Sequence, residues 1–288
     1  INMNIGGTEK ALLTMLNEMD SSKYDITLLM LEKFGGFLNE IPGYVKVKYV
    51  DGFKEVKPFI NEPPQLLAKE LIWSKKYFKG INTLLYYSIS KITNDISSYY
   101  RYVLKNINKI DEEYDLAVAY AGPMDLITYF VLNKVKAKKK AQWIHFDITK
   151  IGFNKAFAEK NYKKFDKVFV VSEEGKNKLI NLIPSLKEKA EVFFNIISCK
   201  LLEDMSKKDK SFDDDFDGKR ILTVGRLSNE KGQDITIPVL ARLKDEGYRV
   251  KWYCIGDGPE KSNYMKNINE LNIMNDYILL GSKLNPYT

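Results

Sequence analysis

An alternation of strand-like and helix-like segments, present on both sides of one polar stretch, limits this chain to few folds. Apolar or alternating runs predict strands before the polar stretch at 25–31, 45–50, 115–120, 141–146, 167–171 and 191–194. Helical periodicity predicts helices among them at 10–19, 66–110, 124–133 and 173–182. Strands that alternate with helices favour parallel sheets covered by helices, which is the α/β class.

The polar stretch divides this alternation into two parts. Residues 206–219 (SKKDKSFDDDFDGK) hold many charges and few apolar side chains. Beyond them the alternation restarts, with strands predicted at 220–224, 249–255 and 277–280 and helices at 235–246 and 260–272. The sequence therefore predicts two Rossmann-like α/β domains, at 1–203 and 220–288, joined by a linker at 204–219. A length of 288 residues suits two domains of ordinary size.

One turn of the second domain combines glycines with two cations. Residues 224–234 read VGRLSNEKGQD, so Arg226 and Lys231 each stand beside a glycine between a strand and a helix. Backbone N–H groups and the helix dipole favour an anion there, and guanidinium and ammonium groups both bind phosphate oxygens. The residues predict either a phosphate or diphosphate site, or a solvated basic turn in which Glu230 is paired with a cation.

The same turn resembles the donor-binding signature of family 4 (group 1) retaining glycosyltransferases with the GT-B fold. Residues 225–227 (GRL) and 231–232 (KG) match the pattern of that family, and 255–260 (IGDGPE) resembles its next glycine turn. The resemblance implies a first domain on the acceptor side and a second that binds a nucleotide sugar, UDP- or GDP-linked. It implies that Arg226 and Lys231 hold the donor diphosphate and that no cofactor is needed.

Further motifs extend the resemblance over nearly the whole chain. The loop at Gly6 and Gly7 matches the glycine loop after the family's first strand, which implies a close backbone approach to the donor diphosphate. His145 ends the strand at 141–146; by resemblance it belongs to the catalytic site and contacts the substrate without acting as a general base. A lone histidine at a strand end is otherwise more often structural. The resemblance also places three glycines near the nucleotide: Gly256, Gly258 and Gly281.

The segment 66–110 carries many basic and aromatic side chains. Eight Lys and Arg residues stand against two acidic ones, and eight aromatic residues are interleaved with them. Basic helices with Trp and Tyr suit the surface of an anionic membrane, but core-packed helices with a solvated basic face have the same composition. Nucleic acid is not expected as a partner, because no binding motif accompanies the charge. A lipid-linked acceptor would reconcile this charge with sugar transfer at the inner face of a membrane.

Composition and charge further limit the partners, the compartment and the kinds of site that the sequence predicts. The net charge of +7 favours an anionic partner, and no uncharged apolar run is long enough to span a membrane. Two distant cysteines suggest a reducing compartment such as the cytoplasm. The run 213–215 (DDD) resembles a metal-binding pattern, but it lies in the polar linker away from any strand end. A solvated loop is the better interpretation, and no metal site is expected.

Both ends of the sequence suggest a trimmed fold, with the second domain incomplete. The family carries two glutamates at the donor site, and by resemblance they would follow residue 288, so catalysis is expected of the complete protein. The preferred hypothesis is a transferase that acts on a glycan or lipid-linked acceptor in bacterial surface polysaccharide synthesis. A non-catalytic module that binds nucleotide sugar or glycan stays open. A dinucleotide-dependent oxidoreductase is disfavoured, since no G-x-G-x-x-G follows a strand.

Overall fold

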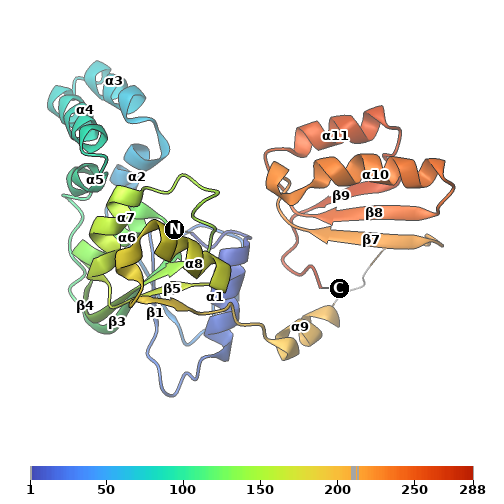
Figure 1. Ribbon diagram of the computed structural model, residues 1–288, viewed down its shortest axis with the longest axis horizontal. Helices are drawn as coiled ribbons and strands as arrows, with labels where there is room; N and C mark the ends of the chain where they lie inside the picture. Colours follow the sequence, from blue (N-terminus) through green and yellow to red (C-terminus); the bar gives the residue numbers. More distant parts are fainter. Residues whose placement is uncertain (1, 209–211, 213, 288) are drawn as a thin grey trace. The chain divides into compact units, whose positions relative to one another are not determined.

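The computed structural model describes residues 2–208, 212 and 214–287 and divides into two compact units (Figure 1). Unit 1 is Ile1–Ile196 and unit 2 is Ile197–Thr288. The predicted limit of the first domain, after residue 203, falls inside α9 (Cys199–Ser206), which lies in unit 2. Both units alternate strands with helices, as the hydrophobic patterns predict.

Unit 1 contains two parallel sheets. In the smaller sheet, β1 (Thr27–Met30) pairs with β2 (Lys46–Tyr49). The larger sheet has the order β3-β4-β5-β6 and is formed by β3 (Glu113–Gly122), β4 (Lys136–Ile144), β5 (Lys167–Val170) and β6 (Ala190–Val192). Because the strands are parallel, their carboxyl ends meet at one edge, where Gly122, Ile144 and Val170 are neighbours in register. Ligands of α/β proteins usually bind at such an edge.

The helices of unit 1 only partly follow the prediction. They are α1 (Gly7–Glu18), α2 (Phe53–Asn61), α3 (Pro64–Trp73), α4 (Tyr77–Ile92), α5 (Ser97–Val103), α6 (Asp125–Lys134), α7 (Lys155–Asn161) and α8 (Glu173–Leu182). The segment 66–110, predicted as one helical stretch, is broken by Lys75 and Asn94, which both have positive φ and end α3 and α4. The short helices α2 and α7 were not predicted, because their periodic pattern is brief.

Two apolar clusters hold the larger sheet of unit 1 to its helices. One joins β3 to the helices from α2 to α7, with Ala119 and Phe157 fully buried. The other joins β4, β5 and β6 to α8, around Val168 and Leu179. Removal of these side chains from water is the main force that fixes the helices on the sheet.

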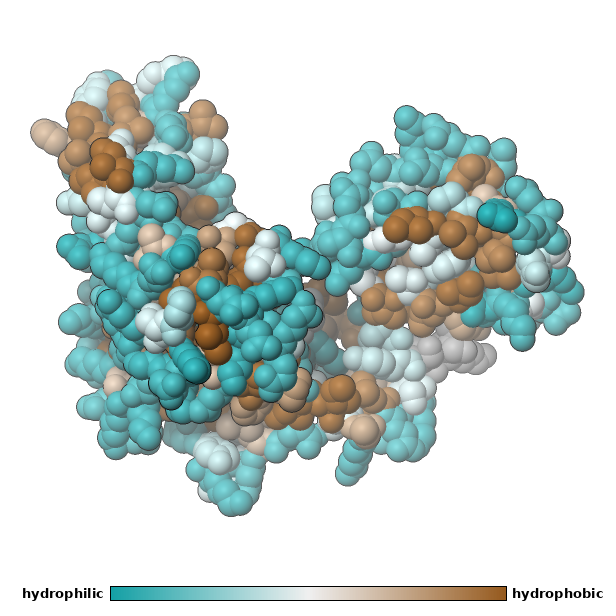
Figure 2. Space-filling view, viewed as in Figure 1, coloured by the Kyte–Doolittle hydropathy of each residue, from teal (hydrophilic) through white to brown (hydrophobic). Residues whose placement is uncertain are grey.

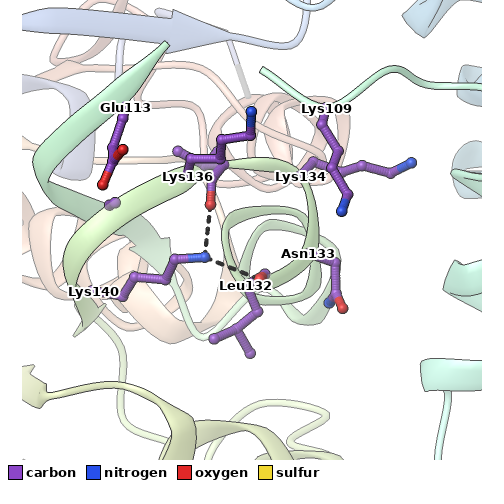
Figure 3. Close-up of a pocket in the computed structure, with 9 residues that line it drawn as sticks. Lys109, Glu113, Leu132, Asn133, Lys134, Lys136 and Lys140 are labelled. Carbon is purple, nitrogen blue, oxygen red and sulfur yellow. Dashed lines mark hydrogen bonds between the residues drawn. The ribbon is translucent and has the colours of Figure 1, made fainter. Parts of the chain in front are cut away.

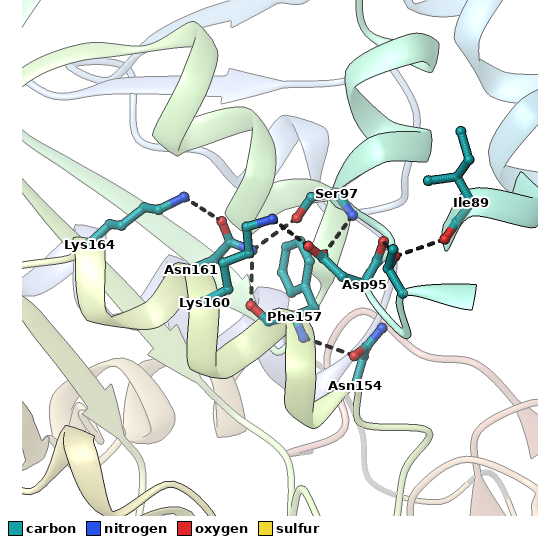
Figure 4. Close-up of polar contacts among 9 residues, drawn as sticks. Ile89, Asp95, Ser97, Asn154, Phe157, Lys160, Asn161 and Lys164 are labelled. Atoms are coloured by element: carbon teal, nitrogen blue, oxygen red, sulfur yellow. Dashed lines mark hydrogen bonds and ion pairs between the residues drawn. The ribbon is translucent and has the colours of Figure 1, made fainter. Parts of the chain in front are cut away.

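Polar contacts fasten the start of α5 to α7 (Figure 4). The Asp95 carboxylate accepts the backbone N–H of Ser97 at 2.9 Å and the Lys160 ammonium at 2.6 Å. Asn161, which is buried, donates its side-chain N–H to Ser97 Oγ at 3.2 Å. These contacts, together with the apolar cluster around α5, fix the base of the α3–α4 region on unit 1.

Unit 2 has one parallel sheet of order β7-β8-β9, formed by β7 (Lys219–Val224), β8 (Val250–Ile255) and β9 (Tyr277–Gly281). Figure 1 shows α10 (Gln233–Asp245) and α11 (Lys261–Glu270) on the same face of this sheet. Leu227, Ile237, Leu240 and Tyr264 are buried between the helices and the strands. Within the part of the chain that the structure describes, no helix has the length and apolar character needed to cross a membrane.

Candidate functional site

The turn after β7 presents both predicted cations to solvent. Strand β7 ends at Val224, a short 3-10 helix spans Asn229–Lys231, and α10 begins at Gln233. The side chains of Arg226 and Lys231 are exposed, and neither forms an ion pair or a side-chain hydrogen bond with another described residue. A Cβ on Gly225 would lie 3.8 Å from the Lys231 chain, so this lysine extends over the strand end.

A second turn, after β8, packs directly against the first. The Gly225 N–H donates to the Ile255 carbonyl at 2.9 Å, and the Leu227 N–H donates to the Asp257 carbonyl at 3.1 Å. A Cβ on Gly256 would lie 1.9 Å from the Gly225 carbonyl oxygen, and one on Gly258 would lie 2.2 Å from the Leu227 carbonyl oxygen. These glycines therefore have a structural role, since only glycine permits so close an approach of two backbones.

The third strand end completes the same edge. Gly281 closes β9 with φ +71°, and its carbonyl accepts the Gly256 N–H at 2.9 Å. A Cβ on Gly281 would meet no atom within 4 Å. Five residues predicted from the sequence thus lie along one sheet edge of unit 2: Arg226, Lys231, Gly256, Gly258 and Gly281.

Gln233 is a residue of this edge that the sequence reading missed. It is only 1% exposed, and its Nε2 donates to the Arg226 carbonyl at 3.1 Å. Its Oε1 is buried and meets no hydrogen-bond donor among the described residues. The side chain therefore holds the backbone of Arg226 against the start of α10. An amide directly after the Lys-Gly pair was the available signal, but sequence alone does not show that it points inward.

His145 lies at the carboxyl edge of the unit 1 sheet, among aromatic rings. Its ring centroid lies 4.5 Å from that of Tyr120 and 5.9 Å from that of Trp143, to which it is almost parallel. Both ring nitrogens are buried, and neither has good hydrogen-bond geometry with a described residue. Burial lowers the pKa of His145 to about 4, so the imidazole is neutral near pH 7. A neutral imidazole has one donor and one acceptor, and both nitrogens are covered by neighbouring residues in this structure.

The glycine loop predicted as a site precedes α1 in unit 1. Gly6 is the N-cap of α1, and a Cβ there would lie 2.6 Å from a carboxylate oxygen of Glu9. A Cβ on Gly7 would meet open space. Burial and the nearby Glu9 charge raise the pKa of Tyr120, which places Glu9 in the electrostatic neighbourhood of the ring that packs on His145. Gly6, Gly7 and His145 all belong to unit 1, and Tyr120, which packs on His145 and is influenced by the Glu9 charge, is a neighbour that the sequence did not reveal.

The acidic run, predicted as a solvated loop away from any strand, is not wholly solvated, because Asp214 contacts residues of β7 and β8. Asp213 lies outside the described residues. Asp214 accepts Lys251 Nζ at 3.1 Å and also accepts Arg220 and the Tyr253 hydroxyl. Hydrogen bonds from Tyr253 and Arg220 lower the pKa of this carboxyl below its usual value. No group of His, Cys, Asp and Glu among the described residues could hold a metal ion.

A shallow cavity of about 370 Å³ opens at the opposite edge of the unit 1 sheet (Figure 3). Lys109, Lys134, Lys136 and Lys140 line it. Lys140 Nζ donates to the carbonyls of Val131, Leu132 and Val135, and Lys134 Nζ donates to that of Ile107. Lys140 therefore satisfies carbonyls at the carboxyl end of α6, where a helix favours cations, and Lys134 ties the last residue of α6 to the loop after α5.

The sheet edge that carries Arg226 and Lys231 lies in a stretch that matches a known protein family. Residues 204–285 match the family model of glycosyl transferases group 1. The match contains every predicted site residue of unit 2. An uncharacterized glycosyltransferase of Methanocaldococcus jannaschii is 30% identical over 129 residues, which cover 44% of this chain and 32% of that protein.

A second curated relative comes from Campylobacter jejuni. It is the N-acetylgalactosamine-N,N'-diacetylbacillosaminyl-diphospho-undecaprenol 4-alpha-N-acetylgalactosaminyltransferase. It is 32% identical over 139 residues, which cover 46% of this chain and 35% of that protein. The matched part of the chain thus spans about a third of each of these curated relatives.

Solved structures resemble the chain over nearly its full length. Anabaena HepE, crystallised with UDP and glucose, superposes with a TM-score of 0.59 at 16% identity, covering 99% of this chain and 68% of HepE. At this identity the likeness concerns the fold. The chain has the GT-B fold class, with two Rossmann-like α/β units, and the prediction from the sequence is confirmed.

Proposed function

We propose that the protein is a retaining glycosyltransferase of family 4 that moves a sugar from a UDP- or GDP-linked donor to a glycan or lipid-linked acceptor. The observation that carries this proposal is the pair Arg226 and Lys231. Both side chains are exposed and form no ion pair or side-chain hydrogen bond among the described residues, although their charges help to lower the pKa of Glu230. They stand at a parallel-sheet edge inside the stretch that matches group 1 glycosyl transferases. Two cations beside a helix N-terminus suit a diphosphate.

The chemistry needs stabilisation of a leaving diphosphate. As the bond between the sugar and the diphosphate breaks, negative charge grows on the phosphate oxygens, and Arg226 and Lys231 would stabilise it. In a retaining reaction of this type the acceptor hydroxyl attacks from the face that the diphosphate leaves. A phosphate oxygen accepts the hydroxyl proton, so a protein nucleophile is not required.

The residues of unit 1 would position the sugars. His145 is neutral near pH 7, so it would hydrogen-bond a sugar hydroxyl without taking part as a charged acid. Gly7, with open space over its α-carbon, would let the backbone approach the donor phosphates, and Gly6 precedes it at the N-cap of α1. Gly256, Gly258 and Gly281 would line the nucleotide in unit 2, in addition to their structural role.

The acceptor class is inferred from the relatives. The Campylobacter jejuni protein is named for action on a diphospho-undecaprenol substrate, which supports a lipid-linked acceptor. Such an acceptor implies a cytoplasmic protein at the inner face of the membrane and a role in cell-surface polysaccharide synthesis. No metal or cofactor is part of this proposal.

The test begins with donor binding by the intact protein, measured by titration calorimetry with UDP and with GDP. Arg226→Ala and Lys231→Ala should each weaken nucleotide binding at least tenfold, since each removes a charge-assisted contact of about 1.5–3 kcal/mol. Arg242→Ala is a matched control, because Arg242 is also exposed but pairs with Glu246 at the end of α10. Equal binding by all three variants and the parent would sink the proposal.

Turnover separates the two remaining functions. UDP release from UDP-sugars, with bacterial membrane lipids as acceptor, should fall by about 10²–10³ in Arg226→Ala and Lys231→Ala. Specific nucleotide binding with no transfer to any acceptor would instead support the non-catalytic binding module.

A further inference from the structure

Helices α3 and α4 form a hairpin whose inner surfaces are closely packed. A Cβ on Gly80 of α4 would lie 2.7 Å from an Ile72 side-chain carbon and 2.9 Å from the Ala68 carbonyl oxygen of α3. Thr83 and Ser90 of α4 are also buried, and their hydroxyls donate to backbone carbonyls of α4 itself. Helix α4 therefore turns Gly80, Thr83 and Ser90 toward the protein, together with the partly buried rings of Tyr86 and Tyr87.

The outward face of α4 carries large apolar side chains. Phe78, Ile81, Leu85 and Ile92 are exposed by 85, 58, 51 and 84%. Their spacing of three, four and seven residues puts them on one stripe of the helix. Figure 2 shows hydrophobic side chains gathered over this hairpin. A contiguous stripe of exposed Phe, Ile and Leu is unusual on a helix that faces water, and it indicates an apolar partner.

The turn between α3 and α4 adds aromatic and basic groups. Trp73 is 76% exposed, and Lys69 Nζ lies 4.7 Å from the centroid of its ring. Lys75 and Lys76 follow directly, and Tyr77 beyond them is exposed. Aromatic rings with a polar edge and long basic chains are the groups that favour the boundary between lipid headgroups and acyl chains.

The charge of the hairpin indicates which kind of apolar partner it binds. Residues 64–93 contain five lysines and one glutamate, a net charge of +4. An apolar stripe flanked by lysines complements a bilayer that combines an apolar interior with anionic headgroups. A purely apolar protein groove would leave these lysines without partners.

We propose that this docking surface, formed by Trp73, Tyr77, Phe78, Ile81, Leu85 and Ile92 with the neighbouring lysines, binds an anionic lipid bilayer. The docking surface contains fewer residues than the basic and aromatic segment 66–110 identified from the sequence. Tyr99 and Tyr102 are buried, and Tyr86 stacks on Tyr102 at 4.9 Å, so these rings belong to the core. The docking surface does not depend on the transferase proposal, because its partner is the bilayer and no sugar substrate is involved.

The experiment measures co-sedimentation with vesicles of phosphatidylcholine alone and with phosphatidylglycerol added. The parent protein should bind the anionic vesicles and bind them less in high salt. The triple variant Phe78→Ser, Ile81→Ser, Leu85→Ser should lose at least tenfold in binding. Lys75→Gln with Lys76→Gln should lose roughly tenfold or more, since each lysine near such a surface contributes about fivefold.

A matched control and a second readout keep the test decisive. Tyr248→Ser with Met265→Ser removes equally exposed apolar side chains from unit 2 and should leave binding unchanged. In parallel, brominated lipids should quench Trp73 fluorescence in the parent protein, with Trp73→Phe as the reference for the two other tryptophans. Absence of vesicle binding, equal binding by parent and triple variant, or self-association that the triple variant abolishes would each overturn the proposal.

Discussion

The carboxyl edges of the β7-β8-β9 sheet and of the β3-β4-β5-β6 sheet have the same architecture but opposite chemistry. The edge in unit 2 carries Arg226 and Lys231 on backbone turns packed at glycines. The edge in unit 1 carries the uncharged His145 among Tyr120 and Trp143. The sheets determine where both edges lie, and the residues that follow each strand set their chemistry. The edge in unit 2 presents two exposed cations, whereas the edge in unit 1 presents aromatic rings around His145, followed by the Asp147–Lys178 ion pair.

The largest effect is expected where the two turns of unit 2 touch. Gly256→Ala should lower the free energy of unfolding by about 3 kcal/mol or more, because its Cβ would clash with the Gly225 carbonyl and its φ is +146°. Gly281→Ala is the control: it has positive φ but no clash, so a loss of about 1 kcal/mol is expected. Urea unfolding followed by circular dichroism measures both, and equal losses would contradict the close packing.

At the edge in unit 1, a dependence of the free energy of unfolding on pH is expected. The pKa of His145 is about 4 in the folded protein and about 6.5 in the unfolded chain, so the unfolded chain binds the proton more readily. The free energy of unfolding should therefore fall as the pH drops from 6.5 to 4, by roughly 1–3 kcal/mol from this group. From about pH 7.5 upward the imidazole is neutral in both states and the group contributes no pH dependence.

Because His145 is the single histidine of the chain, His145→Gln isolates its contribution. Carboxyl groups titrate alike in both proteins, so the difference between the two pH profiles reports the imidazole. Parallel profiles between pH 4 and 6.5 would show that the ring is not buried in the neutral form.

A smaller effect is expected at Gln233, which fixes the backbone of Arg226. Gln233→Leu removes the bond to the Arg226 carbonyl and should cost about 1 kcal/mol of stability. If the cations bind a diphosphate, UDP affinity should fall in this variant. Gln233→Glu keeps the side-chain volume but also removes the donor to the Arg226 carbonyl, so UDP affinity should fall there too. Unchanged UDP affinity in both variants would show that Gln233 does not position Arg226 for UDP binding.

The smallest change in stability is expected at Gly7. Gly7→Ala adds a methyl group in open space at the start of α1 and should alter stability by no more than about 1 kcal/mol, in the stabilising direction. Sugar transfer should fall nonetheless if the donor phosphates approach this backbone. Unaltered transfer would remove Gly7 from the proposed site.

Much of the fold could be predicted from sequence because hydrophobic periodicity is local. The strands ending at Val224 and Ile255 and the helix after Gly232 lie within a few residues of their predicted limits. The cationic turn between them could be predicted for the same reason, since its residues are neighbours along the chain. Short helices such as α7 and the break at Lys75 were missed, because their patterns are too brief or depend on one dihedral angle.

By itself, the sequence determined the α/β class, the GT-B resemblance and the place of Arg226 and Lys231 after a strand. Those properties depend on residue order, which the chain carries directly. Only the tertiary structure decided which aromatic side chains are buried, so that Tyr102 is core and Phe78 faces outward. It alone showed that Gln233 points to Arg226 and that His145 is desolvated by its neighbours. Burial and desolvation depend on segments far apart in the chain, and local pattern does not encode them.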